Sequence, residues 1–187
     1  MSDNNLAIFQ KEIEKFYKRN FYSNVLDGGF YSLGMGFVST TTILPIFVRH
    51  LTDSKFLISL VSAIIIFGGN IPQLISARWA EGWESKRKPL LLLALLMRLP
   101  WLVLAILTYL LTPHYTEYLL AVFFLALTLH SLASGLTTPV WFDLLTKIIP
   151  VNRRGKFFGV RSFTGSLMGI MAAFLTRDII KAYSFPD

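Results

Sequence analysis

The chain has 187 residues, of which 53% are hydrophobic and only 16% are charged, whereas soluble domains carry about 25% charged residues. This composition indicates a membrane protein and excludes intrinsic disorder and collagen-like repeats. The lack of cysteine excludes disulfides, thiolate metal sites and a catalytic thiol. The formal net charge of +7 is compatible with nucleic-acid binding, and that interpretation depends on where the basic residues lie.

Residues 1–24 are predicted to form a cytoplasmic amphipathic N-terminal segment. Four apolar residues, Leu6, Phe9, Ile13 and Phe16, recur at helical spacing with Lys and Glu between them. Two interpretations are open at this point: a short helix that lies in the lipid headgroup region, or a solvated tail that precedes the first membrane span.

Five long apolar stretches follow, and they predict a bundle of membrane-spanning helices. Residues 56–75 contain 20 residues without a charge, which as a helix would reach about 30 Å, the thickness of a hydrocarbon core. Buried helices of soluble proteins show apolar runs of only about 10–14 residues, so several longer runs do not fit a soluble fold. The predicted spans are residues 25–48, 56–75, 89–111, 118–146 and 157–176, in a bundle of residues 25–180.

The sequence therefore predicts an all-α polytopic membrane protein with about five transmembrane helices. The step from Thr138 to Pro139 predicts a kink in the fourth span, because proline removes a helical hydrogen bond. The fifth span is the weakest, since Arg161 lies near its start and Gly, Ser and Thr dilute it. Its Gly165-x-x-x-Gly169 spacing is expected to let a neighbouring backbone approach closely.

Basic residues are distributed unevenly between the two ends of the predicted spans. Thirteen flank one set of ends and four flank the other, so the positive-inside rule places the N-terminus in the cytoplasm and the chain in the cell (inner) membrane. Topology thus accounts for the positive charge, and nucleic acid is not an expected partner. The thirteen are Lys11, Lys15, Lys18, Arg19, Arg78, Lys86, Arg87, Lys88, Lys147, Arg153, Arg154, Lys156 and Arg161.

Two loops carry motifs that resemble those of one transporter family. Between the second and third spans, residues 77–88 have the sequence ARWAEGWESKRK, which is similar to the pattern G-x-L-A-D-R-x-G-R-R with one residue inserted. Between the fourth and fifth spans, residues 150–159 have the sequence PVNRRGKFFG, which resembles P-x-x-R-R-G-[RK]-x-x-G more closely. Both motifs occur at the expected points in the order of spans, and they identify the chain as similar to the amino-terminal half of a major facilitator superfamily transporter.

The resemblance implies a fold and a set of functional residues. Glu81, Lys86 and Arg87 would belong to an inner gate in the loop between spans 2 and 3. Arg153, Arg154 and Gly155 would mark the junction of spans 4 and 5. The family has twelve spans in two six-helix halves, so the resemblance predicts that residues 181–187 are a short tail of an incomplete chain and that a C-terminal half is the missing partner.

Asp27, Arg98 and Asp143 are ionisable residues inside the predicted spans, and each is a functional candidate because a charge inside a bilayer is costly. Asp27 is predicted to be a proton or cation site, a cap of the helix start beside Gly28 and Gly29, or a partner of a lysine in the headgroup region. Arg98 and Asp143 lie at similar depths in antiparallel spans, so we expect them to form a buried ion pair. That pair would serve gating or coupling, or only packing and snorkelling.

Polar side chains inside the second and fourth spans are expected to line a cavity, since the resemblance places spans 1, 2, 4 and 5 around one. These residues are Asn70, Gln73, His130 and Ser134. His130 is the sharpest candidate, because imidazole titrates near physiological pH. The alternative interpretation is that these groups form hydrogen bonds between helices, as is common in membrane bundles.

The sequence carries no metal-ligand cluster, P-loop or Gly-x-Ser-x-Gly motif, so we expect no enzyme activity, metal or cofactor. The predicted function is secondary active transport of a small solute by alternating access. Its partners would be the lipid bilayer, an unidentified small-molecule substrate and the second half of the transporter. Two other functions stay open: a structural or assembly subunit that binds a partner through its glycine face, and a membrane-embedded enzyme.

Overall fold

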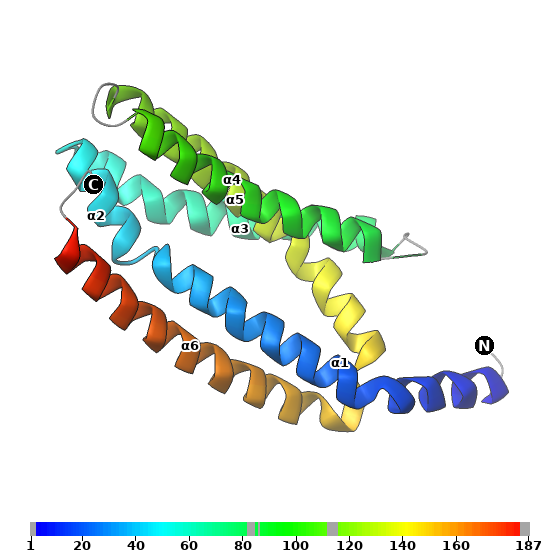
Figure 1. Cartoon of the computed structure of the whole chain (residues 1–187). Helices are drawn as coiled ribbons and strands as arrows, with labels where there is room; N and C mark the ends of the chain where they lie inside the picture. The colour runs from blue at the N-terminus through cyan, green and yellow to red at the C-terminus, as the bar shows by residue number, and fades with distance from the viewer. Residues whose placement is uncertain (1–2, 82–84, 86, 112–115, 184–187) are drawn as a thin grey trace. The chain divides into compact units, whose positions relative to one another are not determined.

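The computed structural model describes residues 3–81, 85, 87–111 and 116–183 (Figure 1). The regular structure of these residues is entirely helical, which confirms the predicted all-α fold class. The elements are α1 (Asp3–Phe37), α2 (Ile43–Leu51), α3 (Lys55–Glu81), α4 (Arg87–Leu111), α5 (Thr116–Ile148), the 3-10 turn η1 (Val151–Arg153) and α6 (Arg154–Ala182).

Four helical segments of the described residues are long and apolar enough to cross a bilayer. They are Lys55–Arg78, Arg87–Leu111, Tyr118–Ile148 and Val151–Ala182. Each contains one of the last four predicted spans. In the third of them, α5 continues through Pro139, so this proline does not end the helix.

The first predicted span, residues 25–48, is divided in the structure. Helix α1 begins at Asp3, continues past the expected boundary at residue 24 and ends at Phe37, and α2 begins only at Ile43. Pro45 explains the interruption, because its ring has no N–H and would clash with the carbonyl four residues earlier, at Thr41. The hydroxyl of Thr42 donates to the Ser39 hydroxyl (2.8 Å), which favours the non-helical backbone. That this region crosses the membrane stays a prediction.

The chain divides into two compact units, of which the first comprises residues 3–38 and 144–183. In this unit α1 and α6 lie side by side (Figure 1). Phe21 near the middle of α1 lies against Phe157 near the start of α6, with ring centroids 5.6 Å apart. Further along both helices, Gly36 lies against Ala172. The two helices therefore run in the same direction, around a buried strip that includes Val25.

The second unit comprises residues 39–143 and holds α2, α3, α4 and most of α5. The backbones of α3 and α5 approach so closely that a Cβ atom at Gly135 would lie 2.5 Å from the carbonyl oxygen of Gly69. The ring of Phe47 in α2 lies 5.3 Å from that of Phe123 in α5. Phe123 is fully buried, so α5 supplies much of the core of this unit.

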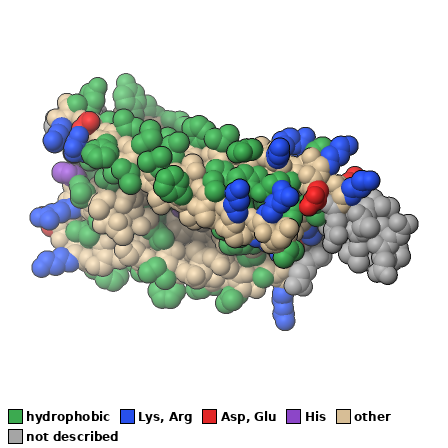
Figure 2. Space-filling view, turned by 90° about the horizontal axis from the view of Figure 1, so that it is seen from below, with side chains coloured by type: hydrophobic (Ala, Val, Ile, Leu, Met, Phe, Trp, Pro, Cys, Tyr) green, Lys and Arg blue, Asp and Glu red, His purple; other side chains and the backbone are tan. Residues whose placement is uncertain are grey.

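Large apolar side chains cover much of the molecular surface. Figure 2 shows hydrophobic side chains spread over the face that it draws. Examples from three candidate spans are Leu74, Tyr109 and Phe163, which are 78%, 85% and 72% exposed. Soluble proteins rarely expose apolar surface on this scale, so these side chains fit a surface that faces lipid or further helices.

Candidate functional site

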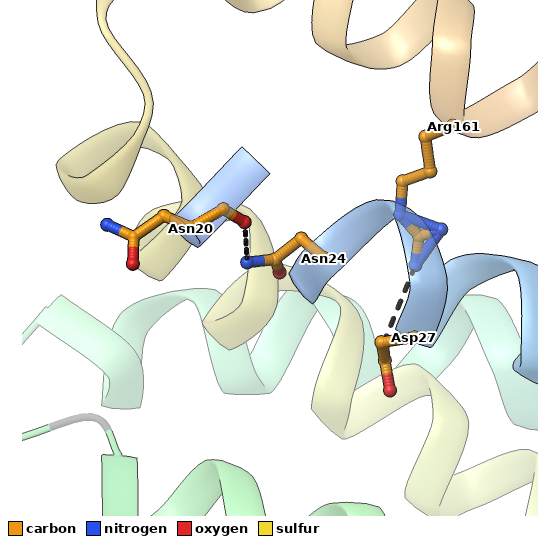
Figure 3. A network of polar contacts seen from close by, with 4 residues as sticks. All are labelled: Asn20, Asn24, Asp27 and Arg161. Carbon is orange, nitrogen blue, oxygen red and sulfur yellow. Dashed lines mark hydrogen bonds and ion pairs between the residues drawn. The ribbon is translucent and has the colours of Figure 1, made fainter. Parts of the chain in front are cut away.

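An ion pair between α1 and α6 is the most distinctive polar feature of the first unit. The Arg161 Nη2 atom lies 3.9 Å from the Asp27 Oδ2 atom, and the two side chains are 20% and 57% exposed. Figure 3 shows Arg161 extending from α6 across α1 toward Asp27. Asp27 lies well inside α1, so the predicted cap of a helix start is wrong. The ion pair joins Asp27 to an arginine of α6, and a lysine partner stays a prediction.

Gly28 makes room for this arginine. A Cβ atom at position 28 would overlap the guanidinium group of Arg161 and would lie 2.8 Å from its Nε atom. The side chain of Arg161 therefore crosses α1 through the notch that Gly28 leaves. Just before this notch, the amide of Asn24 donates to the carbonyl of Asn20 (2.8 Å), which keeps both residues within their own helix (Figure 3).

Small residues four apart continue from the notch along α1. They are Gly28, Ser32 and Gly36, a spacing that places them on one helical face and lets a neighbouring backbone approach. A Cβ atom at Gly165 of α6 would lie 2.8 Å from the Ser32 hydroxyl, whereas one at Gly169 would meet nothing within 4 Å. The predicted close approach thus occurs at Gly165, and α1 also approaches the backbone of Gly169, since a Cβ atom at Gly36 would lie 3.6 Å from the Gly169 carbonyl oxygen. The α1 series was missed, although its spacing was visible in the sequence.

Two consecutive arginines organise the other end of this unit. The Arg153 guanidinium lies over the ring of Tyr17 in α1, 4.5 Å from its centroid. Arg154 donates to the carbonyl of Thr146 (2.6 Å) and to that of Ile149 (3.3 Å). These carbonyls lie at the end of α5, where no helical donors follow, so Arg154 caps α5.

The same contacts bear on the N-terminal segment and on the junction motif. Tyr17 and Phe21 are buried, so the second half of the predicted segment packs against its own unit rather than lying free. At Gly155 an added Cβ atom would meet nothing within 4 Å. Arg153 and Arg154 thus connect the start of α6 to α1 and to the end of α5. Gly155 makes no close contact among the described residues that would require a glycine.

His130 connects α4 and α5 in the second unit. The Trp101 indole N–H donates to His130 Nδ1 (2.8 Å), and the two ring centroids are 4.9 Å apart. The same nitrogen lies 2.8 Å from the carbonyl oxygen of Met97. An indole N–H only donates, so the Trp101 bond requires Nδ1 without a proton, whereas a bond to the Met97 carbonyl requires Nδ1 with one; the tautomer of His130 decides which of the two bonds forms. His130 is buried, and its predicted role in a cavity stays a prediction.

The other polar residues of the predicted cavity bond within their own helices. The amides of Asn70 and Gln73 donate to the carbonyls of Ile66 (2.7 Å) and Gly69 (2.9 Å). The carbonyl of Ser134 accepts from the Thr138 hydroxyl (2.9 Å). The first two bonds hold the Asn70 and Gln73 amides within α3, whereas the third involves the backbone of Ser134 and not its side chain. A cavity that these residues share stays a prediction.

The remaining predicted residues lie in the second unit or at helix ends. Arg98 is exposed and donates to the carbonyl of Ala94 in its own helix (3.0 Å), and its pairing with Asp143 stays a prediction. Glu81 is the last residue of α3 and Arg87 is the first of α4, whereas Lys86 lies outside the described residues. Among the described residues, no group of three or more His, Asp or Glu side chains is arranged to hold a metal ion.

The fold and these contacts define a class of protein. Long apolar helices with exposed apolar surfaces make this a multi-pass α-helical membrane protein. The family model of the Major Facilitator Superfamily matches residues 9–173, which include nearly all of α1 and most of α6. The chain belongs to this family of transporters. Comparisons with curated proteins and with solved structures found no match.

Proposed function

We propose that the chain forms the amino-terminal part of a secondary active transporter that moves a small solute by alternating access. The observation that carries this proposal is the Asp27–Arg161 pair, which joins two helices of a transporter-family chain at a depth where charges are costly. A subunit with a purely structural role would have no need of such a pair, because small residues alone pack helices together.

The depth of the pair follows from the packing of the first unit. Helix α6 belongs to a candidate span, and Arg161 lies seven residues after Arg154, about 10 Å along the helix axis. Helix α1 runs parallel to α6 from Phe21 to Gly36, so we propose that it crosses the membrane at the same level. Asp27 and Arg161 would then lie inside the leaflet on the side of Arg153 and Arg154.

We propose that this side is the cytoplasm, as the distribution of basic residues predicts, and that the membrane is the cell (inner) membrane. Alternating access would arise from rocking against a second six-helix half, driven by an ion gradient or by the gradient of the solute itself. The partners would be the lipid bilayer, the solute and that second half.

Reconstitution of the full-length gene product into proteoliposomes tests the proposal. Labelled amino acids, sugars, carboxylates and nucleosides would be offered with and without an imposed proton gradient, against protein-free vesicles. We expect uptake of at least one class above the vesicle control. Transport would be contradicted if none of these solutes is taken up and the accessibility measurement described next is also negative.

Alternating access has a readout that needs no known solute. The chain has no cysteine, so Asn24→Cys and Ser39→Cys each introduce a single reactive thiol, the first before Gly28 along the chain and the second after the end of α1. Both thiols would be reacted with a membrane-impermeant thiosulfonate. We expect an imposed gradient to raise the reaction rate of one thiol and to lower that of the other. Rates that stay constant at both positions in every gradient would contradict alternating access.

A further inference from the structure

A groove runs along the surface of the second unit between α4 and α5. The described residues that line it are all Leu, Val, Ala or Pro, and they lie within residues 93–107 of α4 and 122–136 of α5. The two helices are antiparallel neighbours, which the bond between Trp101 and His130 joins. The groove therefore follows two candidate spans at the depth of the hydrocarbon core.

Short side chains form the floor of this groove and long ones form its walls. Pro100, Ala126 and Ala133 line the groove and are buried. The walls include Leu96 of α4 and Leu129 of α5, which are both exposed. The groove exists because small residues lie between these leucines, so a larger side chain at the floor would fill it.

The width of the groove matches a single hydrocarbon chain. Its lining residues rise about 21 Å along each helix axis, and its volume is about 410 Å³. Spread over that length, the volume gives a mean cross-section of about 20 Å², or about 5 Å across. A helix with its side chains is about 10–12 Å wide, whereas packed aliphatic carbons lie only about 4 Å apart. An acyl chain therefore has the width of the groove, and a helix would rest only on its rims.

The two ends of the groove differ in charge. Helix α4 begins with Arg87 and Lys88, which are both exposed and lie about 8–9 Å along the axis from the first lining residue, Leu93. Near the other end, the sequence of residues 108–118 has no lysine or arginine and contains Glu117. Basic residues beside a membrane span attract anionic headgroups. A lipid with its chain in the groove therefore meets complementary charge where α4 begins.

We propose that the groove between α4 and α5 binds one acyl chain of an anionic phospholipid, whose phosphate group contacts Arg87 and Lys88. This lipid belongs to the leaflet in which α4 begins. The apolar lining and the width select the chain, and the two basic residues select the charge of the headgroup. The inference goes beyond the proposed transport function and does not depend on it, because it requires only that α4 and α5 cross the membrane.

The test uses the full-length gene product in phosphatidylcholine vesicles and two matched lipids. Phosphatidylglycerol and phosphatidylcholine, each with the same photoactivatable diazirine in one acyl chain, are added separately at the same low mole fraction. After illumination, the crosslinked residues are located by digestion and mass spectrometry. We expect crosslinks within residues 93–107 and 122–136, with a yield from phosphatidylglycerol that is higher by about fivefold for each basic residue that contacts the phosphate.

Variants of the floor connect the crosslinks to the groove. Ala133→Leu should lower the yield within the groove about tenfold, the loss in affinity when about two methylene groups of the chain are displaced. Ala126→Leu tests the same floor at a second position. Ala121→Leu is the matched control, because Ala121 is an exposed alanine of α5 that does not line the groove, and it should leave the yield unchanged.

Variants of the basic residues test the choice of headgroup. Replacing both Arg87 and Lys88 by glutamine should remove the preference for phosphatidylglycerol and leave the crosslinks from phosphatidylcholine in place. Lys55→Gln is the matched control, because Lys55 is an exposed lysine at the start of α3, and it should keep the preference.

Each contrary result overturns a stated part of the inference. If the groove gives no crosslinks, another part of the protein or a second copy covers it, and the lipid site is refuted. Equal yields in Ala133→Leu and Ala121→Leu would also refute it. Equal yields from the two lipids, or a preference that survives the loss of both basic residues, would refute the selection of an anionic headgroup. The transport proposal is unaffected by these outcomes, because solute uptake and the single-cysteine rates test it separately.

Discussion

Replacement of Gly28 by alanine tests the notch directly. The new Cβ atom would overlap the Arg161 guanidinium, so the arginine has to leave its position against α1. Overpacking of this kind costs about 1–3 kcal/mol. Alanine also favours a helix over glycine by about 1 kcal/mol, which would mask part of that cost. A control that gains the same helix propensity without a clash is therefore needed.

Gly34→Ala provides this control, because Gly34 lies in the same helix and an added Cβ atom there would meet nothing within 4 Å. We expect the free energy of unfolding of Gly28→Ala to lie about 1–3 kcal/mol below that of Gly34→Ala, since the propensity terms cancel. The measurement is equilibrium unfolding of the purified protein in detergent micelles.

A double-mutant cycle then identifies the cause of the loss. In an Arg161→Ala background the guanidinium is absent, so Gly28→Ala should cost no more than Gly34→Ala does in that same background. The reasoning is refuted if the two glycine variants are equally stable in the native background, or if the extra cost of Gly28→Ala persists after Arg161 has been removed.

Three further substitutions test the packing and the caps. Gly135→Ala should lower the free energy of unfolding by about 1–3 kcal/mol. Its Cβ atom would lie 2.5 Å from the Gly69 carbonyl oxygen, and a backbone atom cannot change rotamer to relieve the overlap. Trp101→Phe should cost about 0.6–2 kcal/mol through loss of the 2.8 Å bond to His130. Arg154→Gln should cost about 1 kcal/mol, because the last carbonyls of α5 lose their charged donor.

Each of these three predictions has its own check by unfolding in micelles. Gly69→Ala should not lower the free energy of unfolding, because an added Cβ atom at this position meets nothing within 4 Å. Gly135→Ala should lower it. If Trp101→Phe lowers the free energy of unfolding by the same amount in a His130→Phe background as in the native one, the hydrogen bond between the two residues does not contribute to stability. For Arg154→Gln, the comparison is Arg177→Gln, and equal stability of the two would show that the cap contributes nothing.

The sequence predicted what depends on local composition. Apolar length is a property of consecutive residues, so the four segments between Lys55 and Ala182 were found correctly. The end of α1 at Phe37 also had a local signal, Pro45 following four hydroxyl residues, but the high apolar content of residues 25–48 outweighed it. Hydropathy averages over a window and is therefore insensitive to one residue that lacks an N–H group.

The ion pair could not be predicted in the same way. Asp27 was selected because a carboxylate within a predicted span is costly, whereas Arg161 was counted among the basic residues at the cytoplasmic ends of spans and as a residue that weakens the fifth span. Which arginine meets Asp27 depends on which helices are neighbours and in what register. That register is set by small residues on both helices, of which only Gly165 and Gly169 had been noted for close packing.

The same series of small residues thus has two consequences in α1. Gly36 and Ser32 let α6 approach, and Gly28 lets a side chain of α6 pass through to the other face. Packing and charge placement are therefore separable by substitution. Ser32→Ala keeps a small side chain opposite Gly165, so it should preserve both. Gly36→Ala would overlap Ala172 and should weaken the packing while leaving the Arg161 notch open, whereas Gly28→Ala closes the notch itself.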